Sequence, residues 1–262
     1  MIPIADSQRS RTFPYVNVAI ILINFAVFFY ELSLSQHAIQ AVIGNFRITS
    51  ELDRFIFHWG NIPACTFDAL GWNRHLVGPQ VRECAAQPHA AWTPFSAMFM
   101  HGGWLHILGN MLFLWIFGDN IEDAMGHARY AVFYLVVGAL AALTHGLVNA
   151  NDLIPAIGAS GAIAGVMGAY IVLYPRATVR VIIPLFFFIP FRLPAFVLIG
   201  FWFLLQVFSG FSSLGINAVG ASGGVAYFAH IGGFIAGAAL VSIFVIGRHR
   251  SPTAVRGARG AW

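Results

Sequence analysis

The chain has 262 residues, of which 58% are hydrophobic and only 9% are charged, and its formal net charge is +4. Soluble domains carry roughly 25% charged residues, so this composition excludes an ordinary soluble domain and favours a membrane protein. All fourteen cationic side chains are arginine. The arginine-rich segment at the end of the chain is too brief to favour a nucleic-acid partner, and none is expected.

Six apolar runs follow one another along the chain. A run of about 18 or more apolar residues is long enough to cross a ~30 Å hydrocarbon core as a helix. The runs are Phe13–Leu34, Trp104–Ala124, Tyr130–Asn149, Ile157–Tyr174, Pro194–Ser209 and Phe228–Gly247. The chain is therefore predicted to be an all-α, polytopic membrane protein, with residues 1–262 in one domain and six transmembrane helices in a compact bundle.

The stretch before the fifth run is also apolar, but three prolines interrupt it, at Pro184, Pro190 and Pro194. Proline removes a helical hydrogen bond and clashes with the preceding turn, so one straight helix is not expected there. We predict instead that Val179–Leu193 is an interfacial connection that leads into the fifth helix.

The distribution of arginine predicts the orientation. With the N-terminus inside, the inner segments hold ten arginines and the outer segments hold four. Cytoplasmic segments of membrane proteins carry the excess of arginine, so both termini are expected in the cytoplasm. Residues 1–12 then form a cytoplasmic N-terminal segment, and residues 248–262 form a flexible basic tail at the anionic membrane face.

One long outer loop, residues 35–93, separates the first two predicted spans. It contains several aromatic residues, so part of it is expected to lie against the bilayer surface. Both cysteines of the chain, Cys65 and Cys84, belong to this loop. A disulfide is chemically permitted on a periplasmic face, and the sequence leaves a disulfide and two free thiols equally open.

Polar side chains at membrane depth are costly and therefore indicate function. Ser160 lies fourteen residues before Tyr174, roughly 21 Å of helix, which places it about 10 Å below the outer surface. The same count places Asn110 and His230 about 24–25 Å above the inner ends of their own helices. Three polar residues from three helices thus reach a similar depth, which is the geometry of a shared site.

The tetrapeptide GASG occurs twice, around Ser160 and around Ser222. Ser160 begins a run of glycine and alanine, and small residues let helices approach closely, so its helix is expected to be central. Ser222 lies in a glycine-rich, uncharged stretch that favours a mobile loop. Ser160 is therefore the better candidate nucleophile. The stretch Ser209–Gly224 and the fifth helix are the parts expected to move.

Three motifs on separate predicted helices, "HGGWLHILGN", "GASGAIAG" and "AHIGGFIAG", resemble the rhomboid family of intramembrane serine proteases, bacterial six-helix type. The resemblance covers roughly Trp92–Gly247. It implies a multi-pass protein of the bacterial inner membrane that cleaves a transmembrane-helix protein within the lipid bilayer. The segment "EDAMGHARY" also resembles the family's junction between the second and third helices, where Glu122 is expected to bond neighbouring helix ends.

The resemblance further implies a catalytic dyad, with Ser160 as nucleophile and His230 as general base. It assigns Asn110, His106 and the Ser160 backbone N–H to the oxyanion hole. Apart from the resemblance, His101 is expected to bond loop backbone at the rim of the site, in a structural part. These residue types suit the roles, because a serine hydroxyl needs a base to accept its proton and an imidazole titrates near neutral pH. The negative charge of a tetrahedral intermediate needs aimed donors in a low-dielectric site.

Two positions depart from the family pattern. Rhomboids often carry an aromatic residue four positions after the serine, stacked on the histidine, whereas this chain has Ala164. The histidine is then steadied by another ring or held more loosely. Some bacterial rhomboids have an adjacent Trp-Arg pair in the first outer loop, where this chain has Trp72-Asn73-Arg74, so no role is carried over.

Other classes of protein fit less well. His101, His106, His145 and His230 could meet around zinc, but the chain lacks HExxH and an intramembrane carboxylate, so neither a metal nor a cofactor is expected. A transporter would need a buried charged relay. A non-catalytic rhomboid-like protein that binds transmembrane helices is the remaining alternative. The natural substrate and the oligomeric state are left open.

Overall fold

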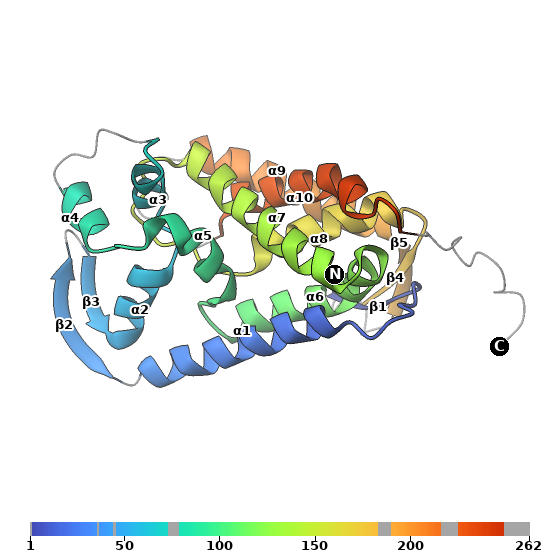
Figure 1. Ribbon diagram of the computed structural model, residues 1–262, viewed down its shortest axis with the longest axis horizontal. Coiled ribbons are helices and arrows are strands. Elements are labelled where there is room, and N and C mark those ends of the chain that lie inside the picture. The colour runs from blue at the N-terminus through green and yellow to red at the C-terminus, as the bar shows by residue number, and fades with distance from the viewer. Residues whose placement is uncertain are drawn as a thin grey trace, which may run out of the picture.

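The computed structural model describes residues 2–35, 37–43, 46–72, 79–182, 190–215 and 225–248, and the chain is mostly helical there (Figure 1). Helices occupy the six predicted positions. They are α1 (Tyr15–Leu34), α6 (Trp104–Met125), α7 (His127–Val148), α8 (Ser160–Leu173), α9 (Ala195–Gly215) and α10 (Tyr227–Phe244). The ends agree with the predicted runs to within a few residues, except that α9 continues to Gly215 and not only to Ser209.

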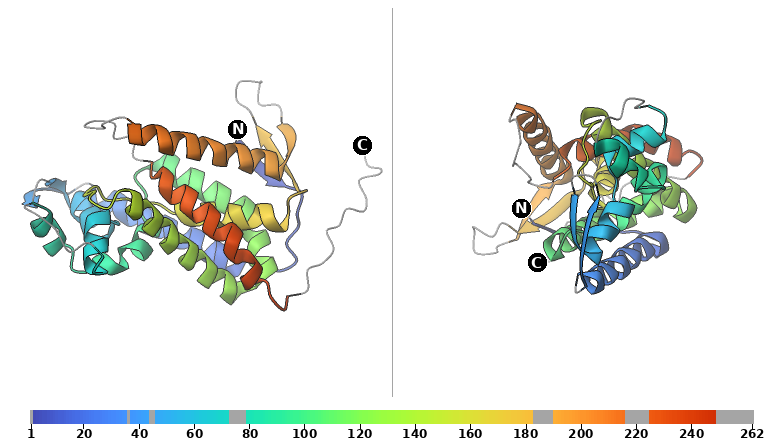
Figure 2. Two further views of the ribbon diagram at one scale, coloured as in Figure 1. Left: turned by 90° about the horizontal axis from the view of Figure 1, so that it is seen from above. Right: turned by 90° about the vertical axis from the view of Figure 1, so that its left-hand side faces the viewer.

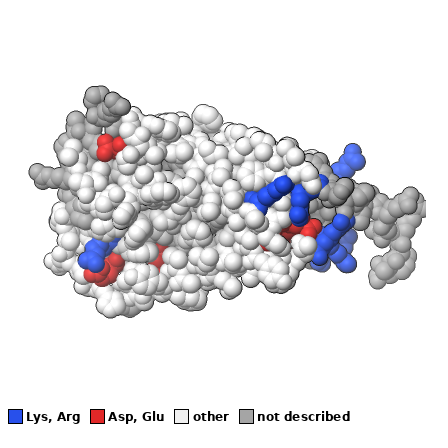
Figure 3. All heavy atoms as spheres, in the orientation of Figure 1, with Lys and Arg blue, Asp and Glu red and all other residues white. Residues whose placement is uncertain are grey.

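Within the described ranges, four helices are long and apolar enough to cross a membrane: α1, α7, α9 and α10. Helix α8 is apolar as well but has 14 residues, and α6 has 22 residues with carboxylates near its end. Their outward surfaces are apolar. Exposed side chains include Leu22, Trp115, Leu204, Phe208 and Ile235. Figure 3 shows charged side chains towards both ends of one face and a broad uncharged surface between them. The chain is a multi-pass membrane protein.

The segment between α1 and α6, which includes the predicted outer loop, is folded and not extended. It contains a two-stranded antiparallel sheet and a series of short helices, which lie together at one end of the molecule (Figure 1). The elements are β2 (Ala38–Ile43), β3 (Phe46–Ser50), α2 (Glu51–Trp59), α3 (Pro63–Ala69), α4 (Pro79–Ala85), η1 (Ala90–Trp92), α5 (Thr93–Ser96) and η2 (Ala97–Phe99). A disulfide joins Cys65 in α3 to Cys84 in α4, which answers the question that the sequence left open.

The disulfide is expected to stabilise the outer loop against local opening. It closes a loop with a sequence separation of 19 residues, and a loop of this length removes about 3 kcal/mol of chain entropy from the unfolded state. The double change Cys65→Ser and Cys84→Ser should therefore raise the rate of limited proteolysis in residues 60–90 by roughly 10–100-fold, because proteases cut the opened form. An unchanged digestion rate would show that the loop is held by its packing alone.

A second, three-stranded antiparallel sheet lies at the opposite end, with strand order β1-β4-β5 (Figure 2). It is built from β1 (Ile2–Asp6), β4 (Thr178–Ile182) and β5 (Pro190–Pro194). The chain is mostly helical, as predicted, and these two short sheets are additions that the sequence did not predict. Within the segment predicted as an interfacial connection, Val179–Leu193, the strands β4 and β5 pair antiparallel, and residues 183–189 lie outside the described residues. β-Branched residues favour β4, and Pro190 and Pro194 are tolerated because β5 is an edge strand.

Asp6, at the end of β1, connects this sheet to the helices. Its carboxylate accepts hydrogen bonds from the hydroxyl of Tyr170 in α8 and from Asn120 Nδ2 in α6, the latter at 3.0 Å. Burial is the main cause that raises the Asp6 pKa from 3.8 to about 6. The backbone of the N-terminal segment thus pairs with β4, and the partly buried Asp6 carboxylate binds the segment to α6 and α8.

The raised pKa predicts a stability that depends on pH. A carboxyl whose pKa is higher in the folded state stabilises that state below the unfolded pKa of 3.8 and loses the effect as the pH rises through about 6. Asp6→Asn keeps a neutral acceptor oxygen and removes the loss of stability that follows when the carboxyl ionises. The apparent melting temperature of Asp6→Asn should exceed that of the wild type by roughly 2–4 °C at pH 7.5, and the difference should shrink towards pH 4. A constant difference across this range would contradict the assignment.

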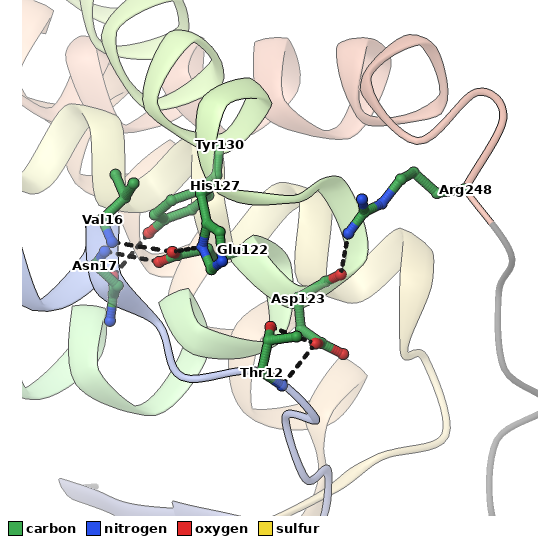
Figure 4. Close-up of polar contacts among 8 residues, drawn as sticks. All are labelled: Thr12, Val16, Asn17, Glu122, Asp123, His127, Tyr130 and Arg248. Atoms are coloured by element: carbon green, nitrogen blue, oxygen red, sulfur yellow. Dashed lines mark hydrogen bonds and ion pairs between the residues drawn. The ribbon is translucent and has the colours of Figure 1, made fainter.

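Glu122 joins three helices near the same end of the bundle (Figure 4). One of its carboxylate oxygens accepts a hydrogen bond from the backbone N–H of Val16 at 2.9 Å, and the other accepts one from Asn17 at 2.7 Å. These are first-turn amides of α1, which have no partner within their own helix. His127 Nδ1 also contacts Glu122, and the hydroxyl of Tyr130 donates to Asn17 Oδ1 at 2.8 Å. Glu122 therefore caps α1 and fixes it against α6 and α7.

Candidate active site

Helix α8 lies at the centre of the bundle and begins at Ser160. Every residue from Gly161 to Tyr170 is buried, whereas Ser160 keeps partial exposure. The helix contacts α6, α7 and α10. The run of glycine and alanine predicted this central position, because a helix with little side-chain bulk can be surrounded closely by others.

Glycine brings α8 and α10 into backbone contact. A Cβ added at Gly165 would lie 3.1 Å from the carbonyl oxygen of Gly233, and one added at Gly237 would overlap the backbone of Gly165. A Cβ at Gly161 would lie 2.8 Å from the Cβ of Ala141 in α7. The small residues on both helices thus set the distance at which their polar side chains face each other.

Ser160 and His230 are brought together by this packing. Ser160 Oγ lies 2.8 Å from His230 Nε2, at the first turn of both helices. His230 is 8% exposed, so the contact is largely shielded from solvent. A hydroxyl at hydrogen-bonding distance from a neutral imidazole nitrogen can transfer its proton to that nitrogen when it attacks an electrophile.

Helix α9 supplies two neighbours of His230 that the sequence reasoning missed. Gln206 Oε1 lies 2.8 Å from His230 Nδ1, and the ring of Trp202 lies 5.7 Å from the imidazole, centroid to centroid. Trp202 is thus a ring beside the histidine in a chain that has Ala164 where the family often has an aromatic. One signal could have identified Gln206, since it is the single amide in an otherwise apolar run.

Asn110 lies in α6, and its side chain contacts His101. Asn110 Nδ2 is 2.9 Å from His101 Nε2, and the backbone N–H of His101 donates to Glu31 Oε2 at 3.1 Å. Asn110 and His101 are 9% and 3% exposed. His101, which was expected at the rim of the site, is therefore a buried residue whose ring contacts the Asn110 amide.

His106 lies beside the loop that leads into α8. Its Nδ1 accepts a weak hydrogen bond from the backbone N–H of Gly102 at 3.4 Å, and its ring lies 5.0 Å from that of His101, centroid to centroid. A Cβ added at Gly158 would lie 2.7 Å from His106 Nε2 and 3.7 Å from Ser160 Oγ. The positive φ of Gly158, 126°, also favours glycine. His106 thus lies on the same side of α8 as the serine.

The loop before Ser160 is fixed by the outer loop. The N–H of Gly158 donates to the carbonyl of Ala97 at 2.8 Å, and Ala156 and Asn61 exchange two backbone hydrogen bonds of 2.8 and 3.0 Å. The first N–H groups of α8 have no partner within the helix and carry the positive end of its dipole. Ser160 therefore lies where a rigid loop meets a helix N-terminus that favours negative charge.

A cavity beside Ser160 is lined mainly by small side chains. Its wall residues include Ala97, Gly138, Ala141, Ala156, Gly161 and Ala229. His145, one of the four histidines considered for a zinc site, lines the same cavity, and Asn149 Nδ2 lies 3.4 Å from its Nδ1. The described part of the chain contains no group of three or more His, Cys, Asp or Glu side chains that could hold a metal ion. Ser222, Asn73 and Arg74 lie outside the described residues.

Comparison with known proteins agrees with this architecture. The family model for the rhomboid domain matches residues 88–247, more than half of the chain. RHOMBOID-like protein 1 of Arabidopsis thaliana is 29% identical over 162 residues, which are 60% of this chain and 39% of that protein. The mitochondrial rhomboid protein 1 of Saccharomyces cerevisiae is 29% identical over 146 residues, 53% of this chain and 38% of that protein.

These relatives are longer proteins, and the chain matches less than half of the length of each of the two. The matched segment nevertheless contains α6 to α10, and with them Ser160, His230 and Asn110. The chain belongs to the rhomboid family.

Proposed function

We propose that this protein is an intramembrane serine endopeptidase that hydrolyses a peptide bond in or next to a transmembrane helix of another protein. The observation that carries the proposal is the 2.8 Å contact between Ser160 Oγ and His230 Nε2. The membership of the rhomboid family, whose members are generally serine proteases, supports the same reaction. Both side chains come from apolar helices, where polar residues are costly unless they serve a purpose.

In the proposed mechanism, Ser160 Oγ attacks the carbonyl carbon of the substrate peptide bond while His230 Nε2 takes the hydroxyl proton. The tetrahedral intermediate collapses when the C–N bond breaks, and His230 returns the proton to the leaving amine. A water molecule then attacks the acyl-enzyme ester, with His230 again as the base. Ser160 is regenerated and a carboxylic acid is released.

The oxyanion of the intermediate needs donors that are already in place. We assign this role to Asn110, His106 and the N–H of Ser160. The contact between Asn110 Nδ2 and His101 occupies one of the two amide hydrogens and leaves the second available. The N-terminus of α8 adds a positive potential at the same place. Loss of one such donor typically lowers turnover by about 10²–10³-fold.

The cavity beside Ser160 supports a preference for a small side chain at the cleavage site, because alanine and glycine form most of its wall. A peptide bond inside a helix is shielded, so the substrate segment must unwind before its carbonyl reaches Ser160. The proposed location is the bacterial inner membrane, and the excess of arginine on one side supports an orientation with both termini in the cytoplasm.

The test is a cleavage assay with the purified protein in detergent and a generic transmembrane substrate. The wild type, a sample treated with EDTA and the variant Ser222→Ala should all cleave. A fluorophosphonate probe, which reacts with activated serines, should label the wild type. Loss of cleavage in EDTA would favour a metal site, and neither cleavage nor labelling by the wild type would favour a non-catalytic protein that binds transmembrane helices.

A further inference from the structure

Gln206 contacts the nitrogen of His230 that faces away from Ser160. We propose that Gln206 is a positioning residue, whose side-chain oxygen holds His230 in the tautomer that carries its proton on Nδ1, so that Nε2 is free to accept the proton of Ser160. The inference rests on the proposed function, and it names a third member of the site that comes from α9.

The two contacts of His230 determine each other. A neutral imidazole has one N–H donor and one acceptor nitrogen, and the partner of one nitrogen selects the state of the other. Gln206 Oε1, 2.8 Å from Nδ1, can only accept, so Nδ1 carries the hydrogen. Nε2 then presents its lone pair to Ser160 Oγ, also at 2.8 Å. The opposite tautomer would donate to Ser160 and could not take its proton.

Burial makes this selection strong. His230 is 8% exposed, and both its ring nitrogens have protein partners in place of water. A buried polar group without a partner costs free energy, so the imidazole and the amide each favour the paired arrangement. Among the described residues, the hydrogen-bond partners of the His230 ring nitrogens are Ser160 and Gln206, and neither is a carboxylate.

The same face of α9 contacts both the ring of His230 and its Nδ1 nitrogen. Trp202 precedes Gln206 by four residues, one helical turn, so both side chains project from one side of the helix. The ring centroids of Trp202 and His230 are 5.7 Å apart. Gln206 is partly buried, whereas Leu204 and Phe208 of the same helix are exposed on its lipid-facing side. Gln206 is therefore directed at His230 and not at the membrane.

A neutral amide orients the histidine without adding a negative charge. The expected effect of its loss is therefore smaller than that of losing a triad aspartate, which lowers kcat by about 10⁴-fold chiefly through the wrong tautomer. We expect Gln206→Met, which keeps the length of the side chain and removes the acceptor, to lower kcat and the rate of fluorophosphonate labelling by roughly 10–100-fold. KM should change by less than about threefold, since Gln206 is proposed to act through His230 and not by binding the substrate.

Two matched variants separate positioning from packing. Gln206→Glu retains an acceptor oxygen at the same reach and should label within about threefold of the wild type. Leu204→Met places the same new side chain on the lipid-facing side of α9 and should be indistinguishable from the wild type. All three variants should melt within a few degrees of the wild type. Normal labelling of Gln206→Met, or equal losses in Gln206→Met and Gln206→Glu, would overturn the proposal.

The tautomer itself gives a readout that does not depend on activity. In protein labelled with ¹⁵N-histidine, the spectrum of the wild type minus that of His230→Asn isolates the His230 resonances. They should show a protonated Nδ1 in the wild type and a shift towards protonated Nε2 in Gln206→Met. A protonated Nε2 in the wild type would refute the inference even if the enzyme cleaves. If the wild type shows protonated Nδ1 but neither cleaves nor labels, the inference survives and the proposed function fails.

Discussion

Replacing Ser160 with alanine is expected to lower kcat for transmembrane substrates by about 10⁴-fold or more, with KM nearly unchanged. The nucleophile would be gone, while the cavity and the donors around it would remain. Quantification of the cleaved fragment on gels over a long incubation measures a loss of this size. His230→Ala should give a loss of similar size, because the hydroxyl is a weak nucleophile without its base.

The losses of kcat caused by Ser160→Ala and His230→Ala should not be additive. Residues that act as one unit lose their whole effect when either is removed, so the double variant should be no slower than Ser160→Ala alone. Ser33→Ala is a matched control, because this serine lies on another apolar helix and its hydroxyl donates within its own turn, to Tyr30 O at 2.6 Å. Residual activity above about 1% in Ser160→Ala would mean that the chemistry lies elsewhere.

Replacing Gly237 with alanine is the second change with a large expected effect, although this residue lies two turns from His230. Its new Cβ would overlap the carbonyl group of Gly165, and backbone cannot move aside as a flexible side chain can. Helices α8 and α10 would have to separate. Overpacking of this kind costs typically ~1–3 kcal/mol, and a displacement of about 1 Å at the dyad costs roughly 10²-fold in turnover.

The assay for Gly237→Ala combines the apparent melting temperature with the rate of fluorophosphonate labelling. Both should fall, with the labelling rate at least ~10²-fold lower than in the wild type. Gly200→Ala provides the control, because an added Cβ at this glycine of α9 meets no atom within 4 Å. Wild-type labelling by Gly237→Ala would show that the contact between Ser160 and His230 tolerates a wider spacing of the helices.

The positions of the helices could be predicted from the sequence because each is an apolar run bounded by glycine, proline or charge. The three-stranded sheet could not, since its strands come from residues 2–6, 178–182 and 190–194, and each becomes a strand only by pairing with a distant partner. Whether Cys65 and Cys84 form a disulfide could not be predicted for a similar reason. Their spacing in the sequence does not indicate that α3 and α4 pack side by side.

Within the site, residues that share a motif were easier to predict than residues that meet only in space. The motifs around Ser160 and His230 were recognised together as parts of one family pattern, and their glycines predicted the close approach of the two helices. Gln206 belongs to none of the three sequence motifs, and it meets His230 only because α9 crosses the first turn of α10. The contact between the Asn110 amide and His101 was not predicted, because it depends on how the turn before α6 folds back onto that helix.

The pairing of β1 with β4 has a practical consequence for anyone who purifies this protein. Ile2 is already in register with Ile182, so a purification tag fused directly ahead of it would begin at the margin of a folded sheet. Because β4 leads out of α8 and β5 leads into α9, strain introduced there would be passed to the two helices that carry Ser160 and Gln206. A spacer of several flexible residues between the tag and Ile2 would keep that strain out of kinetic measurements.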